Sequence, residues 1–154
     1  MRVTTAINPL FDYPIDEIVT ALPGEFDPLW DAFQLRQRLF EVHEPTRSIV
    51  FKWAATQPSG SQAVLVSSYT PSPLRDAVMA CGESLARAFS GTVTSLLLTE
   101  LQSGQRIARH RDSGELLERT HRCHLPIVTN PDVRFLIDNR SYQLRTGTVY
   151  EVDN

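Results

Sequence analysis

The stretch LTELQSGQRIARHRD, residues 98–112, decides the fold that we expect for this chain. Its two ends have the composition of strands, at residues 93–101 and 107–111, and Gly104 lies at the turn between them. Further short strands are expected at residues 122–128, 133–137, 142–144 and 148–152, with turn-like joints at residues 138–141 and 145–147. The second half of the chain is therefore expected to consist mainly of β-strands.

The first third of the chain has the pattern of two helices, each of which buries one apolar face. Pro14 opens the first helix and Pro23-Gly24 ends it, while Asp27 is the expected N-cap of the second and Pro28 its first residue. The residues of these helices expected to face the core are Ile15, Ile18, Val19, Leu22, Leu29, Phe33 and Phe40.

A third helix is expected from Ser72, as N-cap, to Gly91, with strands at residues 49–53 and 63–66 before it. Its expected core residues are Leu74, Val78, Cys81 and Leu85. Helices followed by strands predict an α+β, mainly β fold, which we expect to be a jelly roll, the double-stranded β-helix of cupin-like proteins, with the N-terminal helices packed on it.

The composition fits one domain, residues 1–154, because a chain of this length with 42% hydrophobic residues can bury a core without disulfides. The net charge of −3 gives no basic surplus for nucleic acid. The sequence shows neither a secretion signal nor a run of about 20 apolar residues, so no membrane span is expected. Two cysteines predict no disulfide framework, which favours a reducing, cytoplasmic setting.

His110 and Asp112 are candidate metal ligands, because alternate residues of a strand point to the same side. Non-haem Fe(II) that activates O2 is typically held by two His and one carboxylate on one face. A His-x-Asp pair also occurs by chance, as a loop closure or a salt bridge. The next segment, residues 119–127, brings Arg122 and His124 into an otherwise strand-like run, where polar groups are not explained by core packing.

These segments resemble the aspartyl/asparaginyl β-hydroxylase-like Fe(II)/2-oxoglutarate dioxygenases, a family that includes some amino-acid and proline hydroxylases. The resemblance runs from about residue 42 to the end of the chain. It rests on VHEPTRSI at residues 42–49, on Gly104 before His110-Arg111-Asp112, on RCHLPI at residues 122–127, and on GTVYEVDN at residues 147–154.

The resemblance implies that His110 and Asp112 bind the iron, that Arg122 and His124 contact 2-oxoglutarate, and that Thr99 helps to hold its distal carboxylate. The guanidinium of Arg122 is a planar fork of donors suited to a carboxylate. The implied reaction uses O2 to hydroxylate a C–H bond of an amino acid, an amino-acid-like metabolite or a peptidyl Asp, Asn or Pro side chain. Succinate and CO2 are the implied co-products.

The family pattern places a second iron-binding His and a carboxylate-anchoring Arg beyond Asn154, so the resemblance implies a domain that lacks its C-terminal strands. Two other interpretations stay open: a non-catalytic cupin-like module that binds a carboxylate, and an ordinary polar network. His43 fits a structural His or a pocket edge, and His121 fits a partner of Asp112 or Arg122 or a surface position. Arg106, Arg109 and Arg111 fit an acidic substrate or plain surface.

Overall fold

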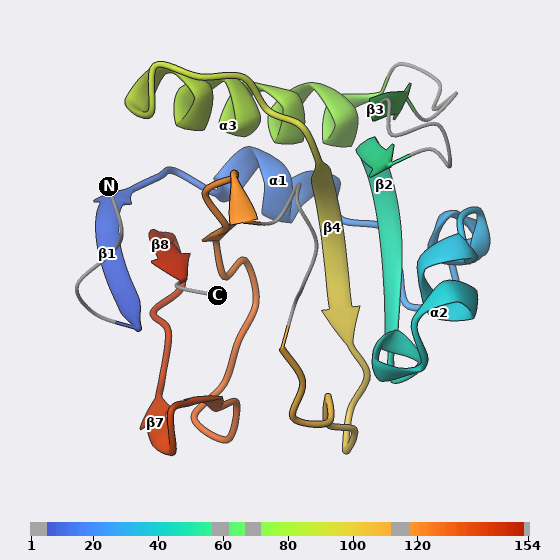
Figure 1. Ribbon diagram of the computed structural model, residues 1–154. Coiled ribbons are helices and arrows are strands. Elements are labelled where there is room, and N and C mark those ends of the chain that lie inside the picture. The colour runs from blue at the N-terminus through green and yellow to red at the C-terminus, as the bar shows by residue number, and fades with distance from the viewer. Residues whose placement is uncertain (1–5, 57–61, 67–71, 112–117, 153–154) are drawn as a thin grey trace. The chain divides into compact units, whose positions relative to one another are not determined.

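The structure, a computed structural model, describes residues 6–56, 62–66, 72–111 and 118–152. The chain divides into two compact units. The terminal unit combines residues 1–20 with residues 111–154, and the central unit comprises residues 21–110. Each unit contains antiparallel sheet (Figure 1). Within the described ranges, no helix combines the length and hydrophobicity that crossing a lipid bilayer requires.

The terminal unit is built around β8 (Thr148–Val152), the middle strand of a three-stranded antiparallel sheet. Its neighbours are β1 (Ile7–Asp12) on one side and β5 (Cys123–His124) on the other. A middle strand is covered on both edges, and the β-branched Val149 is fully buried. β1 is an edge strand that contains Pro9 and an irregular register after it, as expected where a residue without an N–H lies in a sheet.

A hairpin of β6 (Phe135–Ile137) and β7 (Arg140–Tyr142) completes this unit, together with the short helix α1 (Asp16–Ala21). Asp138 and Asn139 form the two-residue turn of the hairpin with φ values of 50° and 61°. Positive φ at both positions is the geometry of a type I′ turn, and Asp and Asn tolerate it better than most residues. The apolar cluster of the unit comprises Ile7, Leu144 and Val152, with Phe135, Ile137, Tyr142 and Tyr150 packed against it.

Asp12 ties the end of β1 to the turn that precedes β8. Its carboxylate accepts a hydrogen bond from Thr148 Oγ1 at 2.7 Å and forms an ion pair with Arg145 Nη2 at 2.7 Å. Gly147, with φ 78°, allows the chain to turn here, and its carbonyl accepts from Tyr13 N at 2.8 Å. The two ends of the terminal unit are thus joined by side chains as well as by the sheet.

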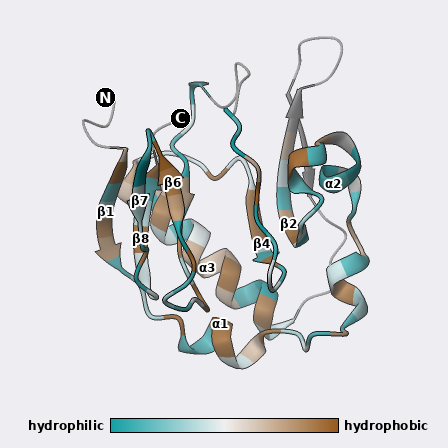
Figure 2. Cartoon of the chain, turned by 90° about the horizontal axis from the view of Figure 1, so that it is seen from below, coloured by the Kyte–Doolittle hydropathy of each residue, from teal (hydrophilic) through white to brown (hydrophobic). Residues whose placement is uncertain are grey.

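The central unit has β2 (Thr46–Thr56) between β3 (Gln62–Val66) and β4 (Leu96–Leu101). Its long helix is α3 (Pro73–Ala88), whose N-cap Ser72 accepts from Arg75 N at 3.2 Å. In Figure 2 hydrophobic and hydrophilic segments follow one another along α3, as in an amphipathic helix. Gly82 lets α3 approach the sheet closely, because a Cβ at this position would lie 3.0 Å from Leu96 Cδ2.

Three short helical segments precede β2: the 3-10 helix η1 (Pro28–Asp31), α2 (Leu35–Leu39) and the 3-10 helix η2 (Glu41–His43). Arg47 of β2 joins η1 to the sheet. Its guanidinium pairs with Glu100 of β4, donates to the carbonyl of Glu25 at 2.5 Å and lies 4.8 Å from the centre of the Trp30 ring. A planar, permanently charged group can make all three interactions at once.

The expected mixture of helices and strands is confirmed, and so are the third helix, its cap and the buried positions of Leu74, Val78 and Cys81. The strands at residues 148–152 and 63–66 also form where they are expected. The described strands make three separate open sheets, and no closed barrel is seen among them.

Several expected elements are wrong or shorter. The expected strand at residues 107–111 is absent. These residues are irregular and exposed, because their two Arg side chains and the neighbouring Arg106 leave too few apolar residues to bury. The second helix is a 3-10 turn followed by the separate α2, and Phe40 is 50% exposed rather than in the core. β5 comprises only two of the seven expected residues and ends before Pro126, which cannot donate to a ladder. β1 was not expected at all.

Val149→Ala is expected to lower the free energy of unfolding by about 2 kcal/mol, because two buried methyl groups are lost and a cavity remains. Urea unfolding followed by circular dichroism measures the change. Val128→Ala is the matched control, since Val128 is 74% exposed and the same truncation there should change stability by less than about 0.5 kcal/mol. Equal effects at the two positions would show that β8 is not the packed centre of its sheet.

The pKa of the Asp12 carboxyl is lowered from 3.8, mainly by the hydrogen bond from Thr148 and further by the charge of Arg145. A carboxyl with a lowered pKa stabilises the folded state above the pKa of the unfolded chain and loses this contribution as the pH falls through the folded-state value. On acidification from above pH 5 to below pH 3.8, the wild-type protein should therefore lose stability through Asp12. In Asp12→Asn the urea midpoint should fall by less over the same pH change. An identical acid response in both proteins would remove Asp12 from this role.

Candidate functional site

His110 lies in the irregular segment that follows β4 in the central unit, and its side chain is exposed. Its Nδ1 is 2.9 Å from the carbonyl oxygen of Ala108. Because a carbonyl only accepts hydrogen bonds, we assign the proton of the neutral ring to Nδ1, which leaves the lone pair on Nε2. A backbone carbonyl that fixes one ring nitrogen in this way is the usual support of a metal-binding His.

His43 of η2 lies beside His110, with ring centres 5.9 Å apart and an interplanar angle of 87°. On its other side His43 meets the ring of Phe40 at 6.0 Å. The edge contact with His43 supports one side of the His110 ring, so His43 lies at the border of the candidate site.

Thr99 is on β4, opposite Ser48 of β2 in the antiparallel register. The Oγ1 atom of Thr99 lies 3.2 Å from Ser48 Oγ, and Nη1 of Arg36 donates to the same Ser48 Oγ at 3.4 Å. Ser48 is 0% exposed, whereas Thr99 is exposed. The exposed residue Thr99 is thus linked through its hydroxyl to the buried Ser48 and, through Ser48, to the half-buried Arg36.

Arg122 and His124 belong to the terminal unit, where the edge of β8 holds their backbone. Val152 N donates to Arg122 O at 2.9 Å, and His124 is opposite Tyr150 in the register. Because side chains alternate along a strand, Arg122 and His124 share one face of the sheet and Cys123 takes the other. The ring of His124 meets that of Phe135 edge-on at 5.7 Å, so its plane is set by the hairpin of β6 and β7.

His121 contacts Glu151, a residue that the sequence analysis did not single out. His121 Nδ1 lies 2.5 Å from Glu151 Oε1, and Glu151 is 8% exposed. The pairing follows from the register, because Glu151 is opposite Cys123 and so shares the face of His121. The alternation in TVYEV gave the only signal in the sequence: a carboxylate at a position where a middle strand is buried.

A family model described as Aspartyl/Asparaginyl beta-hydroxylase matches residues 76–154, just over half of the chain. The chain belongs to the aspartyl/asparaginyl β-hydroxylase family. No curated protein and no solved structure matches it.

The matched region of this hydroxylase family member begins within α3 and contains all five site residues predicted from the sequence: Thr99, His110, Asp112, Arg122 and His124. The structure places Thr99 and His110 in the central unit and Arg122 and His124 in the terminal unit, so each pair is described by itself. Asp112 lies outside the described residues. In the part of the chain that the structure describes, no three His, Cys, Asp or Glu side chains gather in a metal-sized group.

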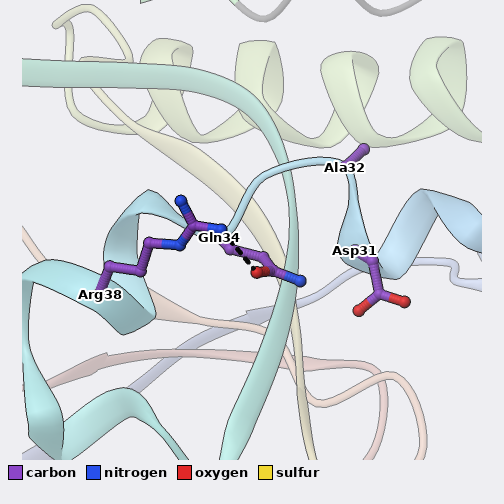
Figure 3. A pocket seen from close by; sticks show the side chains of 4 residues that line it. All are labelled: Asp31, Ala32, Gln34 and Arg38. Atoms are coloured by element: carbon purple, nitrogen blue, oxygen red, sulfur yellow. Dashed lines mark hydrogen bonds between the residues drawn. The ribbon is translucent and has the colours of Figure 1, made fainter.

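The hydroxylase chain also has a pocket in its central unit, lined by Asp31, Ala32, Gln34 and Arg38 (Figure 3). Arg38 donates to Gln34 Oε1 at 3.2 Å, and the two side chains lie against each other while Asp31 stands apart. A second hollow, in the terminal unit, is lined by residues 129–131 and 143–145. Neither is lined by any of the five predicted site residues, and both are wide and shallow.

The two thiols of the hydroxylase chain should differ in reactivity. Burial raises the pKa of the Cys81 thiol to about 11, whereas Cys123 is only partly buried. Since the thiolate is the nucleophile, iodoacetamide at pH 8 should modify Cys123 well before Cys81 in the native protein. Mass spectrometry of the digested protein measures the two rates, and labelling in urea provides the control in which both cysteines react. Equal native rates would contradict the buried position of Cys81.

Proposed function

We propose that this chain is an Fe(II)- and 2-oxoglutarate-dependent hydroxylase. Its substrate class is an amino acid, an amino-acid-like metabolite or a peptidyl Asp, Asn or Pro side chain. Membership of the hydroxylase family supports the reaction class. The observation that carries the proposal for iron is the contact between His110 Nδ1 and the Ala108 carbonyl, which prepares Nε2 as a metal ligand.

The residues of the chain fit the two groups by their chemistry. His110 supplies an imidazole nitrogen and Asp112 a carboxylate oxygen, the ligand types that non-haem Fe(II) takes. 2-Oxoglutarate carries two carboxylates, and Arg122, His124 and Thr99 are a cation, an imidazole and a hydroxyl that can donate to them. When bound, iron and 2-oxoglutarate supply the oxidation that inserts oxygen from O2 into a C–H bond, with succinate and CO2 released.

The work of the protein in this reaction is placement. The Ala108 carbonyl and the edge of His43 fix the His110 ring before any ligand arrives, which avoids the cost of ordering it later. In the terminal unit, β8 holds the backbone of Arg122 and His124 so that both side chains share one face. Donors fixed in this way favour a planar, bidentate grip on a carboxylate.

The same proposal includes the jelly roll fold. Each unit by itself contains a three-stranded antiparallel sheet, with β8 or β2 as its middle strand, and antiparallel sheet is what a double-stranded β-helix is built from. A cytoplasmic location also belongs to the proposal, because the chain has two cysteines and both are thiols.

Succinate formation tests the function. The full-length protein, supplied with Fe(II), ascorbate, O2 and 2-oxoglutarate, is assayed against a panel of amino acids and of peptides containing Asp, Asn or Pro. His110→Ala should reduce succinate release by at least about 100-fold, because a metal ligand is lost. Arg122→Ala should raise the KM for 2-oxoglutarate by about tenfold or more, as expected for losing a hydrogen bond to a charged group.

Arg140→Ala is the matched control for Arg122→Ala, because Arg140 is an exposed residue of β7 in the same unit and should leave the kinetics unchanged. If the wild-type protein neither binds 2-oxoglutarate nor forms succinate with any substrate, the proposed function is wrong. Carboxylate binding that persists after chelation of all metal, without turnover, would instead identify a binding module.

A further inference from the structure

Ser48 is a polar residue in the most buried part of β2. It is 0% exposed, and the residues that follow it, Ile49, Val50 and Phe51, are all buried and apolar. A buried hydroxyl destabilises the fold unless it is hydrogen-bonded, and two polar neighbours of Ser48 provide these hydrogen bonds. These neighbours come from different elements: Arg36 from α2 and Thr99 from β4.

The chemistry of the three groups fixes the direction of the first hydrogen bond and allows the second to be assigned. A guanidinium donates only, so Ser48 Oγ accepts from Arg36. In the 3.2 Å contact between Ser48 Oγ and Thr99 Oγ1 the geometry lets either hydroxyl donate. We assign the hydrogen to Ser48, because its oxygen already accepts from Arg36 and its O–H needs an acceptor in these buried surroundings. Thr99, having accepted, keeps its own O–H to donate, and this side chain is exposed. The series of hydrogen bonds thus runs from Arg36 through Ser48 to the exposed residue Thr99.

We propose that Arg36 and Ser48 are positioning residues that set Thr99 as a hydrogen-bond donor to the distal carboxylate of a dicarboxylic 2-oxo acid. The inference rests on the proposed function, and it adds to it the residues that give the Thr99 hydroxyl its direction. Without Ser48, the Thr99 hydroxyl rotates freely and equally well accepts a hydrogen bond from water. With Ser48 in place, the Thr99 O–H is oriented as a donor before the ligand binds. The positive charge of Arg36, at the start of this series of hydrogen bonds, polarises each bond toward the anion.

Binding, not turnover, tests this role. The dissociation constants of 2-oxoglutarate and of 2-oxobutanoate, which lacks the distal carboxylate, are measured by calorimetry without O2 and with Mn(II) in place of iron. Thr99→Val should raise the dissociation constant of 2-oxoglutarate by about tenfold, as expected for the loss of a hydrogen bond to a charged group. Thr99→Ser should restore the wild-type affinity. Ser48→Ala should raise the dissociation constant of 2-oxoglutarate by about threefold to tenfold. Neither variant should change the affinity for 2-oxobutanoate.

A residue that acts only through Thr99 has no effect once the Thr99 hydroxyl is gone. The double variant Ser48→Ala/Thr99→Val should therefore bind 2-oxoglutarate as weakly as Thr99→Val alone. Should Ser48→Ala fail to fold by circular dichroism, Ser48→Cys takes its place, because a thiol is nearly the same size and a weaker donor, and an intermediate loss of affinity is expected.

The inference is overturned if Ser48→Ala leaves 2-oxoglutarate binding unchanged, weakens both 2-oxo acids equally, or adds its full effect to that of Thr99→Val. A different result overturns the proposed function itself: wild-type protein that binds neither 2-oxo acid in the presence of Mn(II). The two failures are distinguishable, because the first requires a wild-type protein that binds 2-oxoglutarate and the second one that does not.

Discussion

The register of β8 is the constraint on which the terminal unit depends. This strand pairs with β1, from the beginning of the chain, and with β5, about 25 residues before it in the sequence. A slip of one residue between β8 and β5 would turn to the opposite face either Val149 and Glu151 or Arg122 and His124. Burial of Val149 prevents that shift, and Asp12 secures the entry of the strand through Thr148 and Arg145. The register of β8 therefore determines both the core packing and the faces on which the candidate ligand-binding side chains lie.

Elements with complete local signals were predictable from the sequence. Ser72-Pro73 and the helical spacing after it gave α3, and the β-branched run at residues 148–152 gave β8 with its bounds. β1 was not predictable in this way, because INPLFD contains a proline and becomes a strand by pairing with residues about 140 positions away. The expected strand before Asp112 failed for the opposite reason: its local alternation had no apolar face to bury.

The sequence could single out candidate site residues only by their residue type, and their roles stay predictions. His110, Arg122 and His124 stand out in the sequence because imidazole and guanidinium groups are unusual in such strand-like runs. The residues that contact such side chains, or their neighbours, do not stand out in the sequence. Ser48 gains its partners from α2 and β4, and Glu151 gains His121 from a segment 30 residues away. Such pairs follow from sheet register, which no local pattern specifies.

Gly82 connects the packing of the central unit to its polar chemistry. The absence of a side chain lets α3 rest against Leu96, the first residue of β4, and Thr99 is three residues further along that strand. A larger residue at position 82 pushes on the side chain of Leu96, in the strand that carries Thr99. The hydrogen bond between Ser48 Oγ and Thr99 Oγ1 tolerates a change in length of only a few tenths of an ångström. In the proposed site, position 82 would therefore influence the affinity for a dicarboxylate without touching it, so substitutions on that face of α3 would be a route to altered ligand preference.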